Sequence, residues 1–150
     1  MTERQYVICK INEEEYGIGI EYVKEIGEYQ NPTRLPDAPN FVEGIINVRG
    51  VITPLIVLRK KFNKQNKELG KSCRIIIIYF KGKQLGLIVD DASQVLRINE
   101  EDVMPPPHVV EGMEKQYVSG IATLKERMII LLDLKGILSM SKDNTQTQSA

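Results

Sequence analysis

Short runs of apolar residues recur along most of the chain, either continuous or alternating with polar residues, and polar turns separate them. Alternation predicts a strand with one buried face, and a continuous run such as residues 75–80 predicts a strand buried on both faces. Helical spacing is confined to two short segments, around Leu58 and around Leu134. The pattern therefore predicts an all-β fold with short helices only.

The predicted strands fall into two groups of five. The first group covers residues 6–11, 15–20, 23–29, 42–49 and 51–56, and the second covers 73–80, 84–89, 93–98, 117–124 and 128–133. Tight turns are expected at residues 49–50, 81–83 and 125–126. Five strands can form a small closed barrel, which removes exposed sheet edges. We expect two five-stranded barrels, each closed by one of the short helices.

The two groups also resemble each other in sequence, which indicates an internal duplication. Residues 41–62 align without a gap on residues 117–138, at an offset of 76, and residues 16–26 parallel residues 85–95, at an offset of 69. Glycines recur at equivalent positions in the two copies: Gly17, Gly44, Gly86 and Gly120. Such glycines are typical of bulges or strand crossings, and close approach by a partner is the alternative.

The chain has 150 residues, of which 42% are hydrophobic, enough for one domain or two small subdomains that share an interface. We expect one domain over residues 5–140. It would contain two β subdomains, with strands in segments of about 5–62 and 73–138, that could exchange terminal elements. Residues 141–150 are nearly free of hydrophobic side chains and are expected to form a disordered tail.

Charge and cysteine usage narrow the functional class. The 20 basic and 20 acidic residues cancel, which argues against binding to a nucleic-acid backbone as the main task. The first residues do not resemble a signal peptide, and no apolar run is long enough for a membrane helix, so we expect a cytoplasmic protein. Cys9 and Cys73 form no CxxC motif and are expected to be reduced core residues.

No group of residues reads as an active site. His108 is the only histidine and follows three prolines in a predicted loop. Asp90 and Asp91 are adjacent on a strand end, so their side chains should point to opposite faces. Phosphate-binding glycine motifs are absent. We therefore expect a non-catalytic protein-interaction module without cofactor or metal; a nucleic-acid-binding barrel and a small carboxylate-based hydrolase are weaker alternatives.

Several segments resemble the CheW-like domain. They are residues 15–26 (EYGIGIEYVKEI), 41–54 (FVEGIINVRGVITP), 86–90 (GLIVD), 102–107 (DVMPPP), 117–124 (YVSGIATL) and 131–134 (LLDL). The resemblance extends over about residues 5–140, and the Asn-x-Arg-Gly segment at 47–50 is its most specific part. We expect no kinase, phosphoacceptor or receiver extension, and so a chain that is similar to the stand-alone coupling members of the family rather than to the regulatory domain of the kinase CheA.

The resemblance implies two SH3-like five-stranded barrels and a function as adaptor. Such a protein couples methyl-accepting chemotaxis receptors to the histidine kinase CheA, in receptor arrays at the inner face of the membrane. An interaction scaffold of the same fold outside chemotaxis is the alternative.

The family's contact residues can be transferred position by position. The receptor-binding residues would be Val23, Glu25, Gly44, Asn47, Arg49, Ala92, Val95 and Gly120. The kinase-binding residues would be Ile20, Val23, Ile26, Met104 and Val109. From the residues alone, Arg49 could equally be a solvated hairpin tip and Glu25 a solvated strand residue. The family often has Asp where this chain has Val57. The family pattern therefore does not predict the local surface of the first closing helix.

Overall fold

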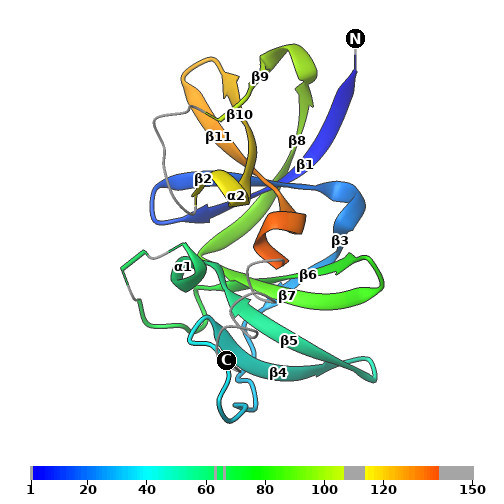
Figure 1. The fold of residues 1–150 in the computed structure, drawn as a ribbon, viewed down its shortest axis with the longest axis vertical. Coiled ribbons are helices and arrows are strands. Elements are labelled where there is room, and N and C mark those ends of the chain that lie inside the picture. Colours follow the sequence, from blue (N-terminus) through cyan, green and yellow to red (C-terminus); the bar gives the residue numbers. More distant parts are fainter. Residues whose placement is uncertain (1, 63, 66, 107–113, 139–150) are drawn as a thin grey trace.

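The computed structural model describes residues 2–62, 64–65, 67–106 and 114–138 of the chain (Figure 1). Its strands are β1 (Glu3–Ile11), β2 (Glu14–Gly19), β3 (Val23–Glu28), β4 (Val42–Val48), β5 (Val51–Val57), β6 (Arg74–Phe80), β7 (Lys83–Val89), β8 (Asp91–Asn99), β9 (Val103–Met104), β10 (Val118–Leu124) and β11 (Arg127–Leu132). Its helices are short: the 3-10 turns η1 (Ile20–Tyr22) and η2 (Glu100–Asp102), then α1 (Leu58–Lys61), α2 (Glu114–Tyr117) and a helical segment at residues 134–138. The prediction of an all-β fold with minor helices is confirmed.

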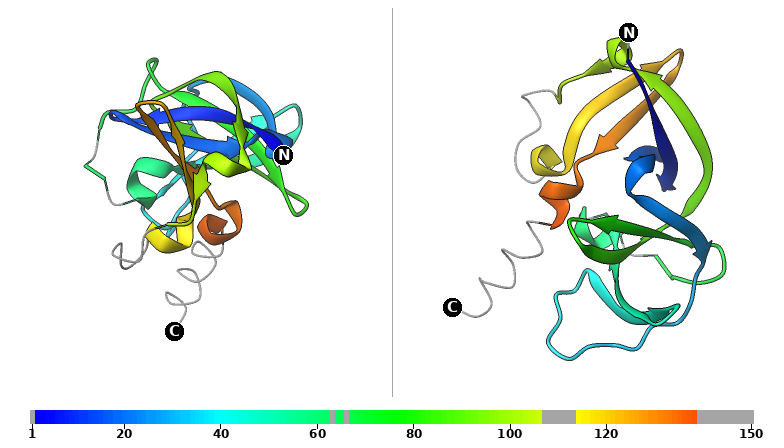
Figure 2. Two further views of the ribbon diagram at one scale, coloured as in Figure 1. Left: turned by 90° about the horizontal axis from the view of Figure 1, so that it is seen from above. Right: turned by 90° about the vertical axis from the view of Figure 1, so that its right-hand side faces the viewer.

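The strands form two mixed sheets, stacked along the long axis of the molecule (Figures 1 and 2). The six-stranded sheet has the order β8-β1-β2-β11-β10-β9, and the five-stranded sheet has the order β3-β6-β7-β5-β4. Each sheet therefore takes strands from both sequence copies. The hairpin β1–β2 lies between two strands of the second copy, and β6–β7 lies between two strands of the first.

This exchange has a physical reason. A two-stranded hairpin alone leaves two unpaired edges and much apolar surface exposed. Insertion into the other copy pairs both edges: β2 runs parallel to β11, and β7 runs parallel to β5. The strand groups expected from sequence are thus present, but no sheet consists of a single group. The SH3-like character of the two units stays a prediction.

The duplication is visible in the registers of these parallel pairs. Leu131 lies opposite Gly17, and Leu55 lies opposite Gly86, which are equivalent positions under the offsets of 76 and 69. A Cβ atom on Gly17 would lie 2.9 Å from Leu131 Cδ2, and one on Gly86 would lie 2.5 Å from Leu55 Cδ2. Each leucine fills the space that a glycine leaves, so these glycines allow the strands of the two copies to pack closely.

The other two recurring glycines lie at β-bulges. The β4–β5 register shifts between Val42 and Gly44, and the β10–β11 register shifts between Val118 and Gly120. Both glycines are buried. The recurrence of these glycines predicted bulges or strand crossings, and at these two positions the structure has bulges.

The core consists of three clusters of buried side chains. The largest lies between the sheets and contains Val7 and Ile18 from one and Ile76 and Leu87 from the other. Two smaller clusters belong to the five-stranded sheet around Leu55 and to the six-stranded sheet around Ile129. Because the largest cluster draws on both sheets, neither sheet buries its apolar surface alone.

Both cysteines lie in these clusters as free thiols. Cys9 is in the cluster between the sheets and Cys73 is in that of the five-stranded sheet. Burial raises the pKa of the Cys9 thiol to about 12. A thiol with so high a pKa carries almost no reactive thiolate at neutral pH. The expectation of reduced core cysteines is confirmed.

The two closing helices begin differently. Asp133 precedes the second helix, and its Oδ1 accepts a hydrogen bond from the Gly136 amide at 3.3 Å. Val57 holds the equivalent position before α1, offers no such bond, and is buried in the cluster of the five-stranded sheet. Val57 therefore contributes core packing and no side-chain cap to α1, and the local surface of α1 does not include it.

A buried ion pair connects the two sheets. Arg59 of α1 donates to Asp90 Oδ2 at 2.6 Å and to the Gln65 carbonyl at 2.9 Å. The same Asp90 oxygen accepts the Asn12 amide, in the β1–β2 turn, at 2.7 Å. Asp91 is exposed and accepts a bond from Ser93. The two aspartates therefore occupy different environments, as expected from their adjacency in a strand.

Candidate functional site

The turn between β4 and β5 places a positive charge at the tip of a hairpin. Arg49 and Gly50 connect the paired residues Val48 and Val51, and both have positive φ, 50° and 89°. This is the backbone of a two-residue hairpin turn that matches strand twist, and Gly50 adopts it at little cost. The Asn47 side chain accepts the Gly50 amide at 2.7 Å and so fixes the turn. Three residues of the Asn-x-Arg-Gly segment thus build one rigid tip.

Glu25 of β3 holds the guanidinium of Arg49 with both carboxylate oxygens. Arg49 Nη1 contacts Oε2, and Nη2 donates to Oε1 at 3.3 Å. The hydrogen bond to Glu25 raises the pKa of Arg49, which is charged at any physiological pH. A guanidinium held in such a fork is oriented before any partner arrives, while its remaining donors are free to bind.

The Glu25–Arg49 pair reveals the curvature of the sheet. β3 and β4 are the two outer strands of the five-stranded sheet, yet Glu25 of β3 contacts Arg49 in the turn that follows β4. The sheet must therefore curl so far that its edges approach each other. The Arg49 side chain nevertheless stays 77% exposed, and that of Glu25 is 32% exposed. The pair lies on the surface, where a partner protein can reach it.

Exposed apolar side chains occur on the strands that carry the pair. Ile26 follows Glu25 on β3 and is 38% exposed, and Val51 and Ile52 follow the Arg49 turn and are 44% and 59% exposed. Ile20, in the turn before β3, is 36% exposed. Because neighbouring residues of a strand point to opposite faces, Ile26 does not share the face of Glu25. Val51 and Ile52 do lie next to the Arg49 turn, and a charged turn next to exposed apolar residues is typical of protein-docking surfaces.

The predicted receptor residues divide into exposed and buried groups. Glu25, Asn47 and Arg49 come together at the hairpin tip, and Val23 of the same strand as Glu25 is half-buried against the central core. Ala92 and Val95 lie on β8 and Gly120 on β10, in the other sheet, and of these only Val95 is exposed, at 47%. The buried members, Gly44, Ala92 and Gly120, can shape a surface but cannot offer one themselves.

Two of these buried positions leave no space for a side chain. At Gly44, where φ is +152°, a Cβ atom would lie 2.4 Å from the Thr33 carbonyl oxygen. At Gly120 it would lie 2.7 Å from Val103 Cγ1. Substitution at either glycine would therefore displace the neighbouring strand or loop.

The predicted kinase residues are more dispersed. Ile20 and Ile26 are exposed near the beginning and middle of the β3 region, whereas Val23 is half-buried. Met104 is 63% exposed on β9 of the six-stranded sheet. Val109 and the candidate catalytic residue His108 lie outside the described residues.

The six-stranded sheet has no Glu–Arg pair at the positions equivalent to Glu25 and Arg49. It has a polar cluster near one of them, which the sequence did not predict. Gln94 and Lys125 are the sequence equivalents of Glu25 and Arg49. Gln94 accepts a bond from Arg127 at 3.0 Å, and Arg127 also binds both oxygens of Glu15, at 3.1 and 2.8 Å. The duplicated fold therefore presents the hairpin-tip arginine in only one of its two copies.

Comparison with known proteins identifies the family of the chain. Residues 5–142 match the CheW-like domain. The chain is 37% identical over 136 residues to the chemotaxis protein CheW of Klebsiella aerogenes, covering 91% of this chain and 82% of that protein. It is 33% identical over 149 residues to chemotaxis protein CheW of Bacillus subtilis, covering 99% and 93%.

A solved structure agrees with the fold as well as the sequence. The crystal structure of the scaffolding protein TtCheW from Thermoanaerobacter tengcongensis matches with a TM-score of 0.82 and 38% identity, over 88% of this chain and 90% of that one. In the described part of the chain, no helix is long and apolar enough to cross a membrane. The family match covers nearly the whole sequence, and the similar proteins agree with it. The chain therefore belongs to the CheW-like family.

Proposed function

We propose that the chain is a non-catalytic chemotaxis adaptor that couples methyl-accepting chemoreceptors to the histidine kinase CheA, in the cytoplasm at the receptor arrays. The observation that carries the proposal is the exposed Glu25–Arg49 pair at a rigid hairpin tip, beside exposed apolar residues. The names of the relatives, chemotaxis proteins and a scaffolding protein, support the same class of function.

The receptor would bind where the Glu25–Arg49 pair lies. A receptor tip is a helical coiled coil, and a helix can place one apolar face on a protein groove while polar groups set its register. Val23 and Val95 would supply apolar contact, and Arg49 would donate a charge-assisted hydrogen bond to the helix. The buried Gly44, Ala92 and Gly120 would support the strands that carry these residues.

The kinase would bind the apolar residues before and along β3. Ile20 and Ile26 are both more than a third exposed, so each can lose water contact on binding without first leaving the core. Met104 would belong to a second kinase contact together with Val109.

A binding experiment with both partners tests the proposal. The purified chain should bind the regulatory domain of CheA and, separately, a receptor cytoplasmic fragment. Ile26→Asp should weaken kinase binding at least tenfold, because a charge in a desolvated contact costs several kcal/mol, and should leave receptor binding within about threefold.

Met128→Asp is the matched control, because Met128 is also an exposed hydrophobic residue, 65% exposed, and lies on β11 of the six-stranded sheet, which does not pair with β3. A melting curve confirms that both variants fold. A folded Ile26→Asp protein that binds the kinase like the unaltered chain would exclude this surface, and the absence of binding to either partner would refute the adaptor function.

A further inference from the structure

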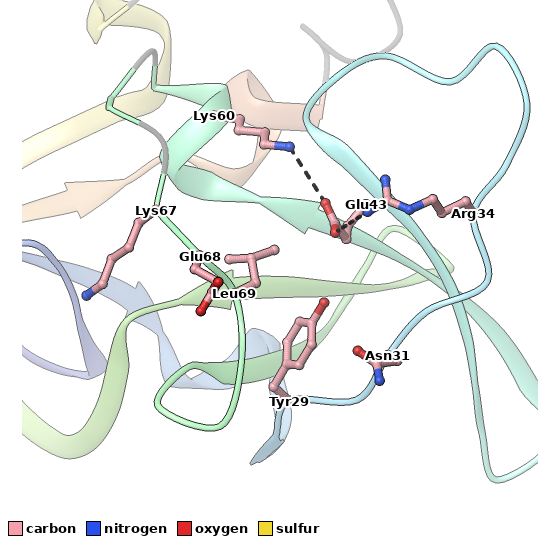
Figure 3. A pocket seen from close by; sticks show the side chains of 8 residues that line it. All are labelled: Tyr29, Asn31, Arg34, Glu43, Lys60, Lys67, Glu68 and Leu69. Atoms are coloured by element: carbon pink, nitrogen blue, oxygen red, sulfur yellow. Dashed lines mark hydrogen bonds and ion pairs between the residues drawn. The ribbon is translucent and has the colours of Figure 1, made fainter.

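A polar pocket of about 540 Å³ lies in the five-stranded half, apart from the Glu25–Arg49 pair (Figure 3). It is lined by residues of the β3–β4 connection, of β4, of α1 and of the α1–β6 connection: Tyr29, Asn31, Arg34, Glu43, Lys60, Lys67, Glu68 and Leu69. Neither the adaptor function nor the family resemblance gives a role to these residues.

The feature that distinguishes this pocket is a buried carboxylate. Glu43 is only 8% exposed and is the extra residue of the β4 bulge, between Val42 and Gly44. Bulges commonly re-aim a side chain, and this one aims the only charged residue of β4 into the pocket. The equivalent residue in the other copy is Ser119, an uncharged side chain that bonds the Leu131 carbonyl.

Glu43 holds two cations side by side. Its Oε2 lies 3.4 Å from an Arg34 nitrogen, and its Oε1 lies 3.7 Å from Lys60 Nζ (Figure 3). Both distances exceed the 2.7–2.9 Å of a strong charge-assisted hydrogen bond, so most donor capacity of the two cations remains available. The carboxylate therefore works as a spacer that keeps two positive groups together despite their mutual repulsion.

The remaining lining adds donors. Tyr29 points its hydroxyl into the same space (Figure 3). Burial and the negative charge of Glu43 raise the pKa of Tyr29, so its hydroxyl stays a donor at neutral pH. Lys67 also lines the pocket, but its Nζ pairs with Asp90 outside it, at 3.8 Å, so the cations that face the pocket are Arg34 and Lys60.

The backbone keeps this donor set in place. Thr33 and Ile45 exchange two backbone hydrogen bonds, of 2.9 and 2.8 Å, which tie the β3–β4 connection to β4. Gly44 allows the close approach, because any Cβ there would meet the Thr33 carbonyl. Arg34, the next residue, is thereby fixed near Glu43 although its side chain is 79% exposed.

We propose that this pocket binds an oxyanion, a phosphate or carboxylate group, between Arg34, Lys60 and Tyr29. A cationic ligand would have to displace Arg34 and Lys60 from Glu43, the buried carboxylate of the pocket. An oxyanion instead uses the donors that Glu43 leaves free: the outer N–H groups of Arg34, the other protons of Lys60 and the Tyr29 hydroxyl. Leu69 and the Tyr29 ring offer apolar contact to a group that carries the anion.

Phosphate titration at constant ionic strength, followed by amide NMR shifts, tests the proposal. Inorganic phosphate should shift the Tyr29, Asn31 and Arg34 amides with a dissociation constant on the order of 1 mM. Phenyl phosphate is titrated separately. Tighter binding than phosphate assigns the pocket to a phosphate on an organic group, and equal binding assigns it to the free ion.

The double variant Arg34→Gln/Lys60→Gln should bind at least tenfold more weakly, since it loses two charged donors. Lys125→Gln/Lys135→Gln removes the same charge from exposed positions of the second copy and should bind like the unaltered chain. Equal loss in both double variants would mean that net charge alone attracts phosphate. That result, or no saturable shift at the pocket up to about 20 mM phosphate, would overturn the proposal.

Discussion

Two arginines of this chain, Arg49 and Arg59, each contact a carboxylate, but their surroundings are opposite. Arg49 is 77% exposed at a hairpin tip, and its partner Glu25 is 32% exposed. The side chain of Arg59 is 5% exposed between the two sheets, and its partner Asp90 is 16% exposed. The chemistry of the two pairs is nearly the same, so burial decides what each one does.

The buried pair belongs to the fold. If one partner were removed, the other charge would remain in a place with little water, which is far costlier than breaking a pair in solvent. The exposed pair contributes little to stability, because water competes for both groups and salt screens them. Arg49 can therefore bind a partner without loss of stability, whereas Arg59 is needed to connect the two sheets.

The largest predicted effect is that of removing the buried arginine. Arg59→Ala removes the charged donor at 2.6 Å and leaves Asp90 only the more distant and half-exposed Lys67, at 3.8 Å, as a cationic partner. It should lower the free energy of unfolding by about 3–5 kcal/mol. Urea denaturation followed by far-UV circular dichroism measures it. A loss below about 1 kcal/mol would show that the Arg59–Asp90 pair is energetically equivalent to a surface pair.

A smaller loss of stability is expected when Arg59 is replaced by lysine, which keeps the positive charge but lacks the two-pronged guanidinium. Arg59 binds Asp90 and the Gln65 carbonyl with different nitrogens, and a single ammonium cannot occupy both positions. Arg59→Lys should therefore cost about 1–3 kcal/mol. The same exchange at Arg49 should leave denaturation nearly unchanged, and equal losses at both sites would remove the distinction between the pairs.

The smallest effect on stability should follow truncation of the exposed arginine. Arg49→Ala keeps Gly50 and the Asn47 bond that fix the turn, so the melting temperature should change by less than about 2 °C. Differential scanning calorimetry measures this shift. A drop beyond about 5 °C would mean that the Glu25–Arg49 pair holds the curled sheet together and is a structural element like the buried pair.

The sequence predicted local features well and long-range partners poorly. The hairpin turns expected at 49–50, 81–83 and 125–126 are present, although the second is one residue shorter because Lys83 already pairs with Phe80. The bulges at Gly44 and Gly120 and the burial of both cysteines also agree with short-range patterns. The sequence did not predict that each sheet combines strands of both copies. Alternation of apolar and polar residues shows that a strand has a buried face, but not which strand lies beside it.

The same limit applies to the charged residues. Arg59 stands before two lysines in a short helix and reads as solvated, and only the fold reveals its burial against Asp90. Glu43 reads as an ordinary strand residue until the bulge directs it into a pocket. Glu25 and Arg49 were selected through the family resemblance, and the structure shows that they touch.

The measurement that tests the central claim most directly is the affinity of the Arg49→Ala chain for a receptor cytoplasmic fragment, by calorimetry, with CheA binding measured in parallel. The account predicts a ten- to hundredfold loss of receptor affinity, the scale of one lost charge-assisted hydrogen bond, while kinase affinity stays within about threefold. Glu25→Ala should act in the same direction, and the double variant should lose less than the two single losses combined, because the residues act as a unit. Receptor affinity that is unchanged in a folded Arg49→Ala protein would leave Arg49 as a solvated hairpin tip and would contradict the proposed receptor site.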